Sequence, residues 1–215
     1  MTEPSGDGLR ARKRAALLVA IQKSAISLAL AHGFDNITVE QICAESMVSQ
    51  RTFFNYFGSK EGVILGLGPP RPTQEQIDVF VRSQSTDVIG DLVRMIAAAL
   101  AERAPDPEVV RGRRTVIMRT PELINRQTAR ISEVEDLLTR TIVARFEAQG
   151  RSMVTTPDLE DEARMVVALA VSVLRYSMKK WVGGNAANSP TELMHQSIEL
   201  IRRITGEPEA TRSAS

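Results

Sequence analysis

Four prolines in the second half of the chain stand directly after a side chain that can cap a helix. These pairs are Asp106-Pro107, Thr120-Pro121, Thr156-Pro157 and Ser189-Pro190. A capping oxygen accepts a free backbone N–H of the first turn, and proline at the first helical position has no N–H to leave unpaired. Each pair therefore predicts a helix start, and together they predict that most of this half is helical.

Apolar residues along the chain recur at the three- and four-residue spacing of an amphipathic helix, and no stretch alternates as β-strands do. Aromatic residues, which are enriched in strands, make up only 4% of the chain. The chain is therefore expected to be all-α, with about nine to ten helices. The expected helices cover residues 9–32, 39–45, 50–56, 60–67, 74–83, 87–104, 107–119, 121–149, 158–182 and 190–205.

A proline-rich break, Gly68-Pro69-Pro70-Arg71-Pro72, interrupts this pattern and predicts a boundary between two domains. We expect a smaller N-terminal domain over residues 9–67 and a larger helical domain over residues 68–205. The two ends, residues 1–8 and 206–215, are polar and are expected to be disordered tails.

Residue types that catalyse reactions or bind metals are scarce in this sequence. Cys43 is the single cysteine and only two histidines occur, so neither a zinc set nor an internal disulfide is available. Gly183-Gly184 follows an expected helix and is interpreted as its end, not as a phosphate-binding loop. We therefore expect no enzyme activity, no metal and no cofactor, and we expect Cys43 to pack inside the fold.

The N-terminus and the apolar segments argue against a secreted or membrane protein. Residues 1–8 are polar and mixed in charge, unlike a signal peptide. The longest strongly apolar run, residues 165–174, falls short of the roughly 18 residues that a membrane-spanning helix needs. The expected location is the cytoplasm, with no membrane partner.

Residues 38–57 contain two short helices joined by a tight turn. Thr38 caps the first helix and Ser49 caps the second. The apolar side chains that can form a small core between them are Ile42, Cys43, Val48, Phe53 and Phe57. The hydrogen-bonding side chains that remain outward on the second helix are Gln50, Arg51, Thr52, Asn55 and Tyr56. This is the helix-turn-helix arrangement, whose second helix fits the major groove of DNA.

Residues 9–66 resemble the DNA-binding domain of the TetR family of bacterial transcriptional regulators. The segments that carry the likeness are Gly33-Phe34-Asp35, Thr38-Val39-Glu40-Gln41-Ile42, Val48-Ser49, Thr52-Phe53-Phe54-Asn55-Tyr56-Phe57 and Ser59-Lys60-Glu61. The resemblance implies a sequence-specific DNA-binding regulator, an N-terminal three-helix domain with a larger helical ligand-binding and dimerisation domain, and repression as the usual mode. It departs at Phe54, where the family often has a phosphate-contacting tyrosine, and we expect Tyr56 to supply that contact.

Chemistry assigns the side chains of the second helix to bases or to phosphates. Arg51 matches guanine O6 and N7, whereas Gln50 and Asn55 suit adenine. Thr52 suits a thymine methyl group or a phosphate, and Ser49 at the helix start brings free N–H groups towards the DNA backbone.

Further phosphate contacts are implied by the resemblance. Thr38 and Lys60 resemble residues that contact phosphates in the family. A basic run before the first helix resembles the arm that the family places against phosphates or in a minor groove, and its members are Arg10, Arg12, Lys13 and Arg14. Residues 8–60 carry seven Lys or Arg against three Asp or Glu, although the whole chain has a formal net charge of only +1. Such a local surplus favours binding to a polyanion.

One recognition helix reads too little sequence alone, so a homodimer on double-stranded DNA with an inverted-repeat operator is expected. The helix around residues 165–174 is apolar nearly all round and needs cover from both its own core and a partner. The expected dimer contacts on the last two helices are Val166, Leu169, Val173, Leu193, Leu200, Ile201 and Ile204.

A regulator of this family usually releases DNA when a small molecule enters its helical domain. The apolar composition of that domain favours a mostly apolar effector. Candidate lining residues are Phe80, Met95, Met118, Leu123, Phe146, Tyr176 and Trp181.

Two alternatives from other classes remain open at this point. An architectural DNA-binding protein would need a more basic surface and apolar wedges for unstacking bases. A protein-interaction module with a degenerate helix-turn-helix is weakly favoured by Phe54. Salt dependence and sequence preference of DNA binding separate these alternatives from the regulator.

Overall fold

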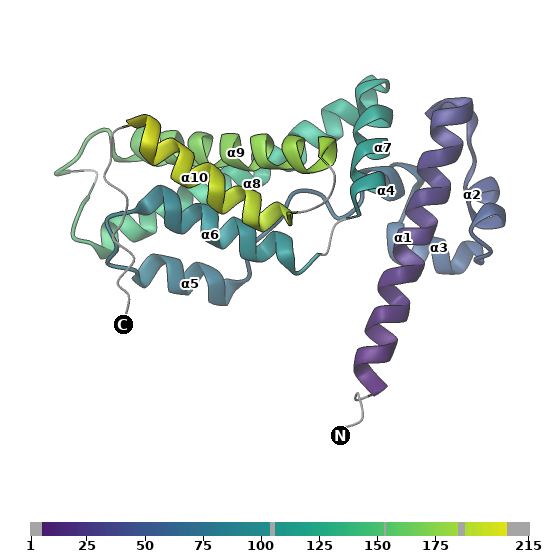
Figure 1. Cartoon of the computed structure of the whole chain (residues 1–215), viewed down its shortest axis with the longest axis horizontal. Helices are drawn as coiled ribbons and strands as arrows, with labels where there is room; N and C mark the ends of the chain where they lie inside the picture. The colour runs from purple at the N-terminus through teal and green to yellow at the C-terminus, as the bar shows by residue number, and fades with distance from the viewer. Residues whose placement is uncertain (1–5, 104–105, 153, 185–187, 206–215) are drawn as a thin grey trace. The chain divides into compact units, whose positions relative to one another are not determined.

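The computed structural model describes residues 6–103, 106–152, 154–184 and 188–205, and all regular structure in these ranges is helical, which confirms the all-α prediction. Figure 1 shows the helices, with colours that follow the chain from purple to yellow. They are α1 (Gly6–His32), the 3-10 helix η1 (Phe34–Asn36), α2 (Val39–Glu45), α3 (Gln50–Phe57), α4 (Lys60–Leu65), α5 (Gln74–Arg82), α6 (Val88–Ala101), α7 (Pro107–Met118), α8 (Pro121–Ala148), α9 (Leu159–Gly183) and α10 (Pro190–Thr205).

Every expected helix is present with end residues close to those expected. Side-chain caps explain this agreement, because Thr38, Thr73 and Asp106 each accept backbone N–H groups of the turn that follows. Helix starts of this kind are set by local chemistry, which sequence alone reveals.

The start of α1 differs from the expectation. The helix begins at Gly6, so residues 6–8, which were expected in a disordered tail, are helical. The apolar spacing begins only at Leu9 and therefore carries no signal for a solvated first turn. The remaining expected tail residues, 1–5 and 206–215, lie outside the described residues. The 3-10 helix Phe34–Asn36 was not expected either.

The chain forms two compact units. The first unit consists of residues 1–68 together with residues 105–130, and the second of residues 69–104 together with residues 131–215. The chain leaves the first unit after Gly68, and α7 and the first turns of α8 belong with the N-terminal helices. No local pattern in the sequence reveals this, because the packing joins segments far apart in the chain.

The core of the first unit is built on α1. This helix packs against η1, α2, α4 and α7. Its buried residues include Ile21, Ala25 and Ile26, and the same cluster contains Val116 of α7 and Leu123 of α8. Burial of these side chains provides the main stabilisation of the unit.

A polar contact adds to the packing of α1 on α7. The ammonium of Lys23 lies 2.9 Å from the carboxylates of both Asp106 and Glu108 at the start of α7. Asp106 also caps α7, since its Oδ1 accepts the N–H groups of Glu108 and Val109. Hydrogen bonds from Lys23 and Val109 hold the pKa of Asp106 below its ordinary value although burial alone would raise it.

Among the described residues, the segment Arg12–His32 of α1 is long and apolar enough to span a membrane by length and composition. The core helix of a soluble protein passes the same test. Here Ile21, Ala25 and Ile26 are buried in the core of the first unit, so the segment is weak evidence for membrane insertion.

The second unit packs α10 against both α6 and α9, and α6 against α9 (Figure 1). Its apolar cluster includes Leu92 of α6, Ile142 of α8, Ala170 of α9 and Met194 of α10. The unit therefore has its own hydrophobic core, contributed by every helix in it.

We expect Gly112→Ala in α7 to destabilise the first unit by about 1–3 kcal/mol, because it forces an overpacked crossing with α1. A Cβ at this position would lie 2.4 Å from Cγ2 of Ile26, a buried side chain with little room to shift. Urea unfolding followed by circular dichroism measures the change.

The matched control is Gly183→Ala at the end of α9, where a new Cβ meets no heavy atom within 4 Å. Helix propensity alone makes this control neutral or slightly stabilising. Equal behaviour of the two variants would contradict the tight crossing.

Candidate functional site

Helices α2 and α3 form the expected helix-turn-helix, and side-chain caps fix where each helix begins. Thr38 Oγ1 accepts the N–H of Gln41 at 3.2 Å, and Gln41 Oε1 accepts the N–H of Thr38 at 2.9 Å. This reciprocal pair is a capping box. At the start of α3, Ser49 Oγ accepts the N–H of Thr52 at 3.1 Å. Both caps use residues expected to contact DNA, so these side chains also have a structural role.

The turn between the two helices contains a strained residue. Met47 has φ of 53°, a left-handed conformation that costs energy for any residue with a side chain. The N–H of Val48 donates to the carbonyl oxygen of Cys43 at 3.0 Å and closes the turn. The Met47 side chain is 91% exposed, so packing does not offset the strain.

The inner side of α3 is aromatic. Phe53 is completely buried, and its ring lies 5.5 Å from that of Phe54 in a T-shaped pair and 5.7 Å from that of Phe57. Cys43 of α2 is buried in the same cluster, as expected, and burial raises the pKa of its thiol. These contacts fix the rotation of α3 and therefore decide which side chains point outward.

The outer side of α3 carries the residues expected to contact DNA. Gln50, Arg51, Asn55 and Tyr56 are exposed, and Thr52 is half-buried. Arg51 forms no ion pair within the part of the chain that the structure describes. Its guanidinium is therefore available to an external acceptor.

Glu40 of α2 lies beside the start of α3, and it was not among the residues expected to contact DNA. Its Oε1 accepts from Nε2 of Gln50 at 3.1 Å. Its own backbone N–H, the hydroxyl of Thr38 and the amide of Gln50 hold the pKa of Glu40 below its ordinary value, so it is ionised at neutral pH. Gln50 is thus oriented by a carboxylate and must share or leave this hydrogen bond to reach a base.

The basic run of Arg10, Arg12, Lys13 and Arg14 lies within α1 and not before it, because α1 begins at Gly6. All four residues are exposed. Helical spacing puts Arg10, Lys13 and Arg14 on neighbouring positions of one face. The guanidinium of Arg14 lies 5.2 Å from the ring centroid of Tyr56. The basic face of α1 therefore adjoins the outer side of α3.

Lys60, which was expected to contact a phosphate, also has a structural role. Its ammonium donates to the carbonyl oxygens of Phe34 at 2.9 Å and Ile37 at 3.1 Å, and lies over the Phe34 ring at 4.5 Å. An ammonium has three N–H groups, so one donor remains for a phosphate. Lys60 thus ties α4 to the segment that leads into α2.

The residues expected to line an effector pocket do not gather in one cavity. Met118 is exposed and Leu123 is buried, and both belong to the first unit. Tyr176 lies half-exposed on α9. Large apolar side chains fill a close-packed core as readily as they line a cavity, so residue type alone does not separate the two.

Two of the candidates, Phe80 and Met95, line the same pocket in the second unit, which we name the α5–α6 pocket. Its volume is about 360 Å³, and its lining consists of Glu75, Gln76, Val79, Phe80, Ser83, Asp91, Arg94 and Met95. Phe146 and Trp181 are buried and are not among these lining residues. The described residues contain no cluster of His, Cys, Asp and Glu that could hold a metal ion.

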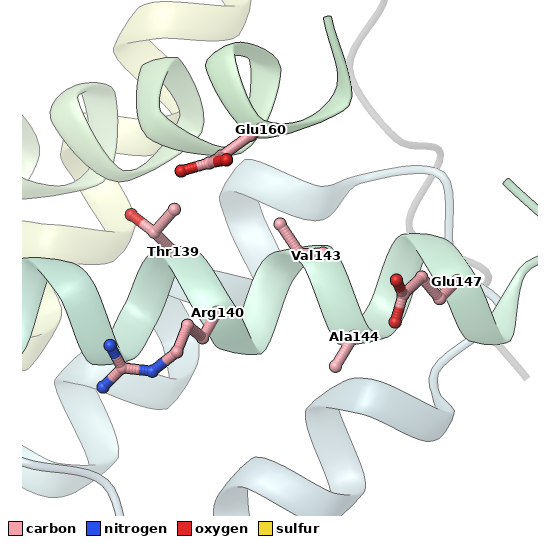
Figure 2. A pocket seen from close by; sticks show the side chains of 6 residues that line it. All are labelled: Thr139, Arg140, Val143, Ala144, Glu147 and Glu160. Atoms are coloured by element: carbon pink, nitrogen blue, oxygen red, sulfur yellow. The ribbon is translucent and has the colours of Figure 1, made fainter. Parts of the chain in front are cut away.

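A second pocket of about 320 Å³ lies between α8 and α9 (Figure 2). Its lining residues are Thr139, Arg140, Val143, Ala144, Glu147 and Glu160. Glu160 of α9 faces the side chains of α8, and its carboxylate also accepts from Arg164 at 2.5 Å. Among the described residues, none of the buried side-chain donors without a hydrogen-bond partner belongs to this lining.

Three of the residues expected at a dimer interface are buried within their own subunit, namely Val166, Val173 and Leu193. Leu200 and Ile201 are half-buried, and Ile201 packs against the core. A helix that is apolar nearly all round does not indicate which side faces its own core. The structure resolves this ambiguity in favour of the core for these residues.

Leu169 and Ile204, the other two expected contacts, are 40% and 74% exposed. Met165 and Tyr176 extend the exposed apolar face of α9 at helical spacing from Leu169. We name Met165, Leu169 and Tyr176 the α9 face.

Comparisons with known proteins agree with this geometry. The family model described as bacterial regulatory proteins, tetR family, matches residues 21–67. The chain is 32% identical over 191 residues to the HTH-type transcriptional regulator TcmR of Streptomyces glaucescens, covering 83% of this chain and 78% of that protein. It is 28% identical over 193 residues to MftR of Mycobacterium tuberculosis, which has the provisional name mycofactocin biosynthesis transcriptional regulator, covering 88% and 91% of the two chains.

Among solved structures, Salmonella enterica GusR is similar at 20% identity and a TM-score of 0.41, covering 96% of this chain and 97% of that chain. The likeness to TcmR extends well beyond residues 21–67, so it includes most of the second unit.

We expect Met47→Gly to stabilise the first unit by about 0.5–1 kcal/mol, since relief of the left-handed strain exceeds the extra chain entropy of glycine. The matched control is Ala44→Gly, an exposed position inside α2, which should destabilise by a similar amount. Urea unfolding of the two variants gives both values. A loss of stability in Met47→Gly equal to that of the control would show that the turn is not strained.

Proposed function

Because the chain belongs to the TetR family of bacterial regulatory proteins and is a DNA-binding transcriptional regulator, we propose that it is a dimeric repressor. It holds an inverted-repeat operator through the α3 helix of each subunit and releases the operator when a small, mostly apolar effector binds. The observation that carries this proposal is the outer side of α3, where exposed polar side chains adjoin the basic face of α1.

The side chains divide into base readers and backbone contacts. Arg51 is exposed, and its fork fits guanine, whereas Asn55 one turn later fits adenine. Arg14 and Tyr56, already in contact, suit the phosphates that flank the groove. Thr52 and the N-terminal N–H groups of α3 add contacts to the backbone. A regulator needs both kinds of contact, since phosphates fix position and bases fix sequence.

The exposed α9 face supports a dimer, and a dimer can bind both half-sites of an inverted repeat. An exposed apolar stripe on an otherwise polar helix surface favours contact with a partner of the same chemistry, and twofold symmetry brings the same stripe from a second copy. Ile204 of α10 adds a further exposed apolar side chain. A DNA target and membership of the family support a location in the cytoplasm.

Release by an effector requires only modest coupling. A coupling free energy of about 1–3 kcal/mol between ligand and DNA changes operator affinity about 5–150-fold. The second unit offers the α5–α6 pocket for such a ligand.

The direct test is a binding selection with the purified protein and sheared genomic DNA of its source at physiological salt. A specific operator should be bound about 10³–10⁷ times more tightly than other DNA. A few fragments with one shared inverted repeat support the proposal. Uniform recovery of all fragments would indicate an architectural protein, and no recovery would indicate an interaction module.

We expect Arg51→Ala to weaken binding to the selected operator by about 1–3 kcal/mol per half-site and to relax the preference at one base pair of each half-site. The control is Arg82→Ala on α5, an exposed arginine of the second unit, which should leave the affinity unchanged. Fluorescence anisotropy with operator variants measures both. Weaker binding with an unaltered base preference would make Arg51 a phosphate contact instead.

We expect Leu169→Arg on the α9 face to convert the dimer into monomers, because it puts a charge into an apolar contact that both subunits share. Val154→Arg is the matched control, since Val154 is 92% exposed and lies outside the α9 face. Sedimentation velocity distinguishes the two species. An unchanged dimer in Leu169→Arg would locate the interface elsewhere.

A further inference from the structure

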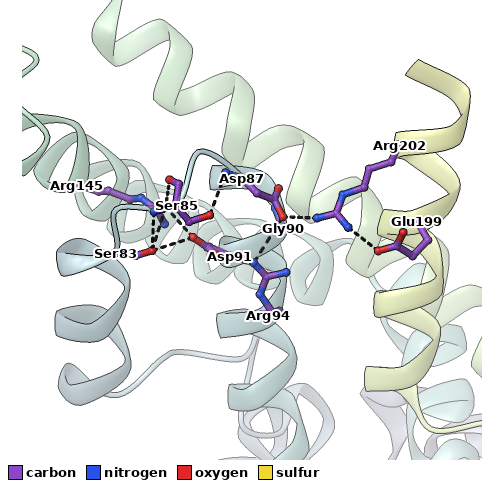
Figure 3. Close-up of polar contacts among 9 residues, drawn as sticks. All are labelled: Ser83, Ser85, Asp87, Gly90, Asp91, Arg94, Arg145, Glu199 and Arg202. Carbon is purple, nitrogen blue, oxygen red and sulfur yellow. Dashed lines mark hydrogen bonds and ion pairs between the residues drawn. The ribbon is translucent and has the colours of Figure 1, made fainter. Parts of the chain in front are cut away.

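Arg145 of α8 is a completely buried cation in the second unit. Its Nη2 donates to the carbonyl oxygen of Ser85 at 2.7 Å and to Oδ2 of Asp91 at 2.6 Å, and lies 3.4 Å from Oγ of Ser83. Figure 3 shows the guanidinium meeting the loop between α5 and α6 and the start of α6. A buried charge is tolerated only when it is paired and hydrogen-bonded, and Nη2 satisfies both conditions.

The other edge of the same guanidinium is unsatisfied. Nε and Nη1 of Arg145 are buried and find no hydrogen-bond acceptor in the part of the chain that the structure describes. The Phe80 ring covers the flat face of the guanidinium, with its centroid 4.6 Å from Cζ. A ring face favours a cation but does not replace two lost hydrogen bonds. An anchor for the loop alone needs only Nη2, so the unpaired edge requires another explanation.

The carboxylates near Arg145 are shared with other arginines. Arg94 and Arg145 share one carboxylate, that of Asp91, and Arg94 also lies 3.5 Å from Asp87. Asp87 in turn pairs with Arg202 of α10 (Figure 3). Although burial raises it, hydrogen bonds from Arg145 and Arg94 hold the pKa of Asp91 below its ordinary value. Asp91 is thus divided between two guanidinium groups, and it contacts Arg145 only at Nη2.

The α5–α6 pocket adjoins this arginine. Three residues that contact Arg145 also line the pocket, namely Phe80, Ser83 and Asp91. Val79 and Met95 give the pocket an apolar wall, and Arg94 and Glu75 are polar residues of its lining. Its volume of about 360 Å³ falls within the usual range for small-molecule sites.

We propose that the α5–α6 pocket is the effector site and that the effector is a small amphipathic acid. Its carboxylate, or an equivalent oxyanion, accepts from Nε and Nη1 of Arg145, and its apolar body lies against Val79 and Met95. Phe80 both lines the pocket and covers the guanidinium, so rotation of this side chain opens the path between them. The inference rests on the proposed function, since it names the chemical class of the effector. It adds one negatively charged group to the mostly apolar effector of that proposal.

The same contacts connect ligand binding to the backbone. Arg145 holds the α5–α6 loop through Ser85, and Gln149 of α8 donates to the carbonyl oxygen of Ser83 at 3.1 Å. An oxyanion on Nε and Nη1 leaves the contacts of Nη2 with Ser85 and Asp91 in place, so one guanidinium holds both the ligand and the α5–α6 loop. The lining of the second pocket contains no buried unpaired donor like those of Arg145 among the described residues.

The test is isothermal titration of the full-length protein, without DNA, with pairs of probes that differ only in their polar group. Suitable pairs are 4-phenylbutyrate with 4-phenylbutanol, and straight-chain carboxylates with the alcohols of equal length. We expect the acids to bind about 10- to 100-fold more tightly than the alcohols, as charge-assisted hydrogen bonds to a buried arginine provide. Equal binding of acids and alcohols, or no saturable binding of any acid in the millimolar range, overturns the proposal.

Variants connect the preference to one residue. Arg145→Gln should abolish the preference for acids, whereas Arg140→Gln, an exposed arginine on the same helix, should keep it. Because Arg145→Gln also loosens the loop, its circular dichroism is compared with the parent protein. Should it not fold, Arg94→Gln at the half-exposed pocket lining replaces it, with a smaller but measurable loss of acid binding. An equal loss in Arg140→Gln would overturn the proposal.

The titrations contain no DNA, so their failure leaves the DNA-binding function untouched. Failure of the operator selection with acid-selective binding intact would instead contradict the proposed repressor.

Discussion

The burial of one face of α1 is the constraint on which the DNA-binding unit depends. Ile21, Ala25 and Ile26 form its centre, and η1, α2, α4 and α7 all pack against this helix. Helices α2 and α3 have seven and eight residues, too few for a helix to be stable alone in water. Their packing against α1 in the shared core therefore determines their orientation. The side of α3 proposed to contact DNA keeps its orientation only while α1 is packed, and the close approach of Gly112 to Ile26 belongs to that packing.

The chain passes between the two units at residues 68–69, 104–105 and 130–131. The last of these passages lies inside α8, so one helix contributes Leu123 to the core of the first unit and Ile142 to the core of the second. Helix α8 therefore belongs to both units, and it also carries Arg145 of the proposed effector site.

Features that depend on interactions between residues close in the chain could be predicted from the sequence, and features that depend on distant residues could not. Caps such as Thr38 and Ser49 act within one turn, so helix starts and the helix-turn-helix were predictable. The outward side of α3 followed from the spacing around Phe53. The packing of α7 on α1 was not predictable, because Gly112 and Ile26 are far apart in sequence. The same holds for Lys60, whose ammonium binds carbonyl oxygens of Phe34 and Ile37. Val166 and Val173 were assigned to a dimer contact because an apolar helix carries no mark of which side faces its own core.

Two arginines illustrate how environment decides what one residue type does. In the proposed complex, DNA replaces the water around the exposed Arg51, and the attraction of Arg51 to phosphates and bases is weakened by salt. Arg145 is completely buried with two unpaired donors, so a ligand that lacks an oxyanion would leave them unpaired in the complex as well. Sites that demand a hydrogen-bonding partner reject molecules without one far more strongly than apolar sites reject a wrong shape. The buried arginine therefore makes the second unit selective by chemistry, whereas the exposed arginine on α3 must obtain its selectivity from the geometry of the groove.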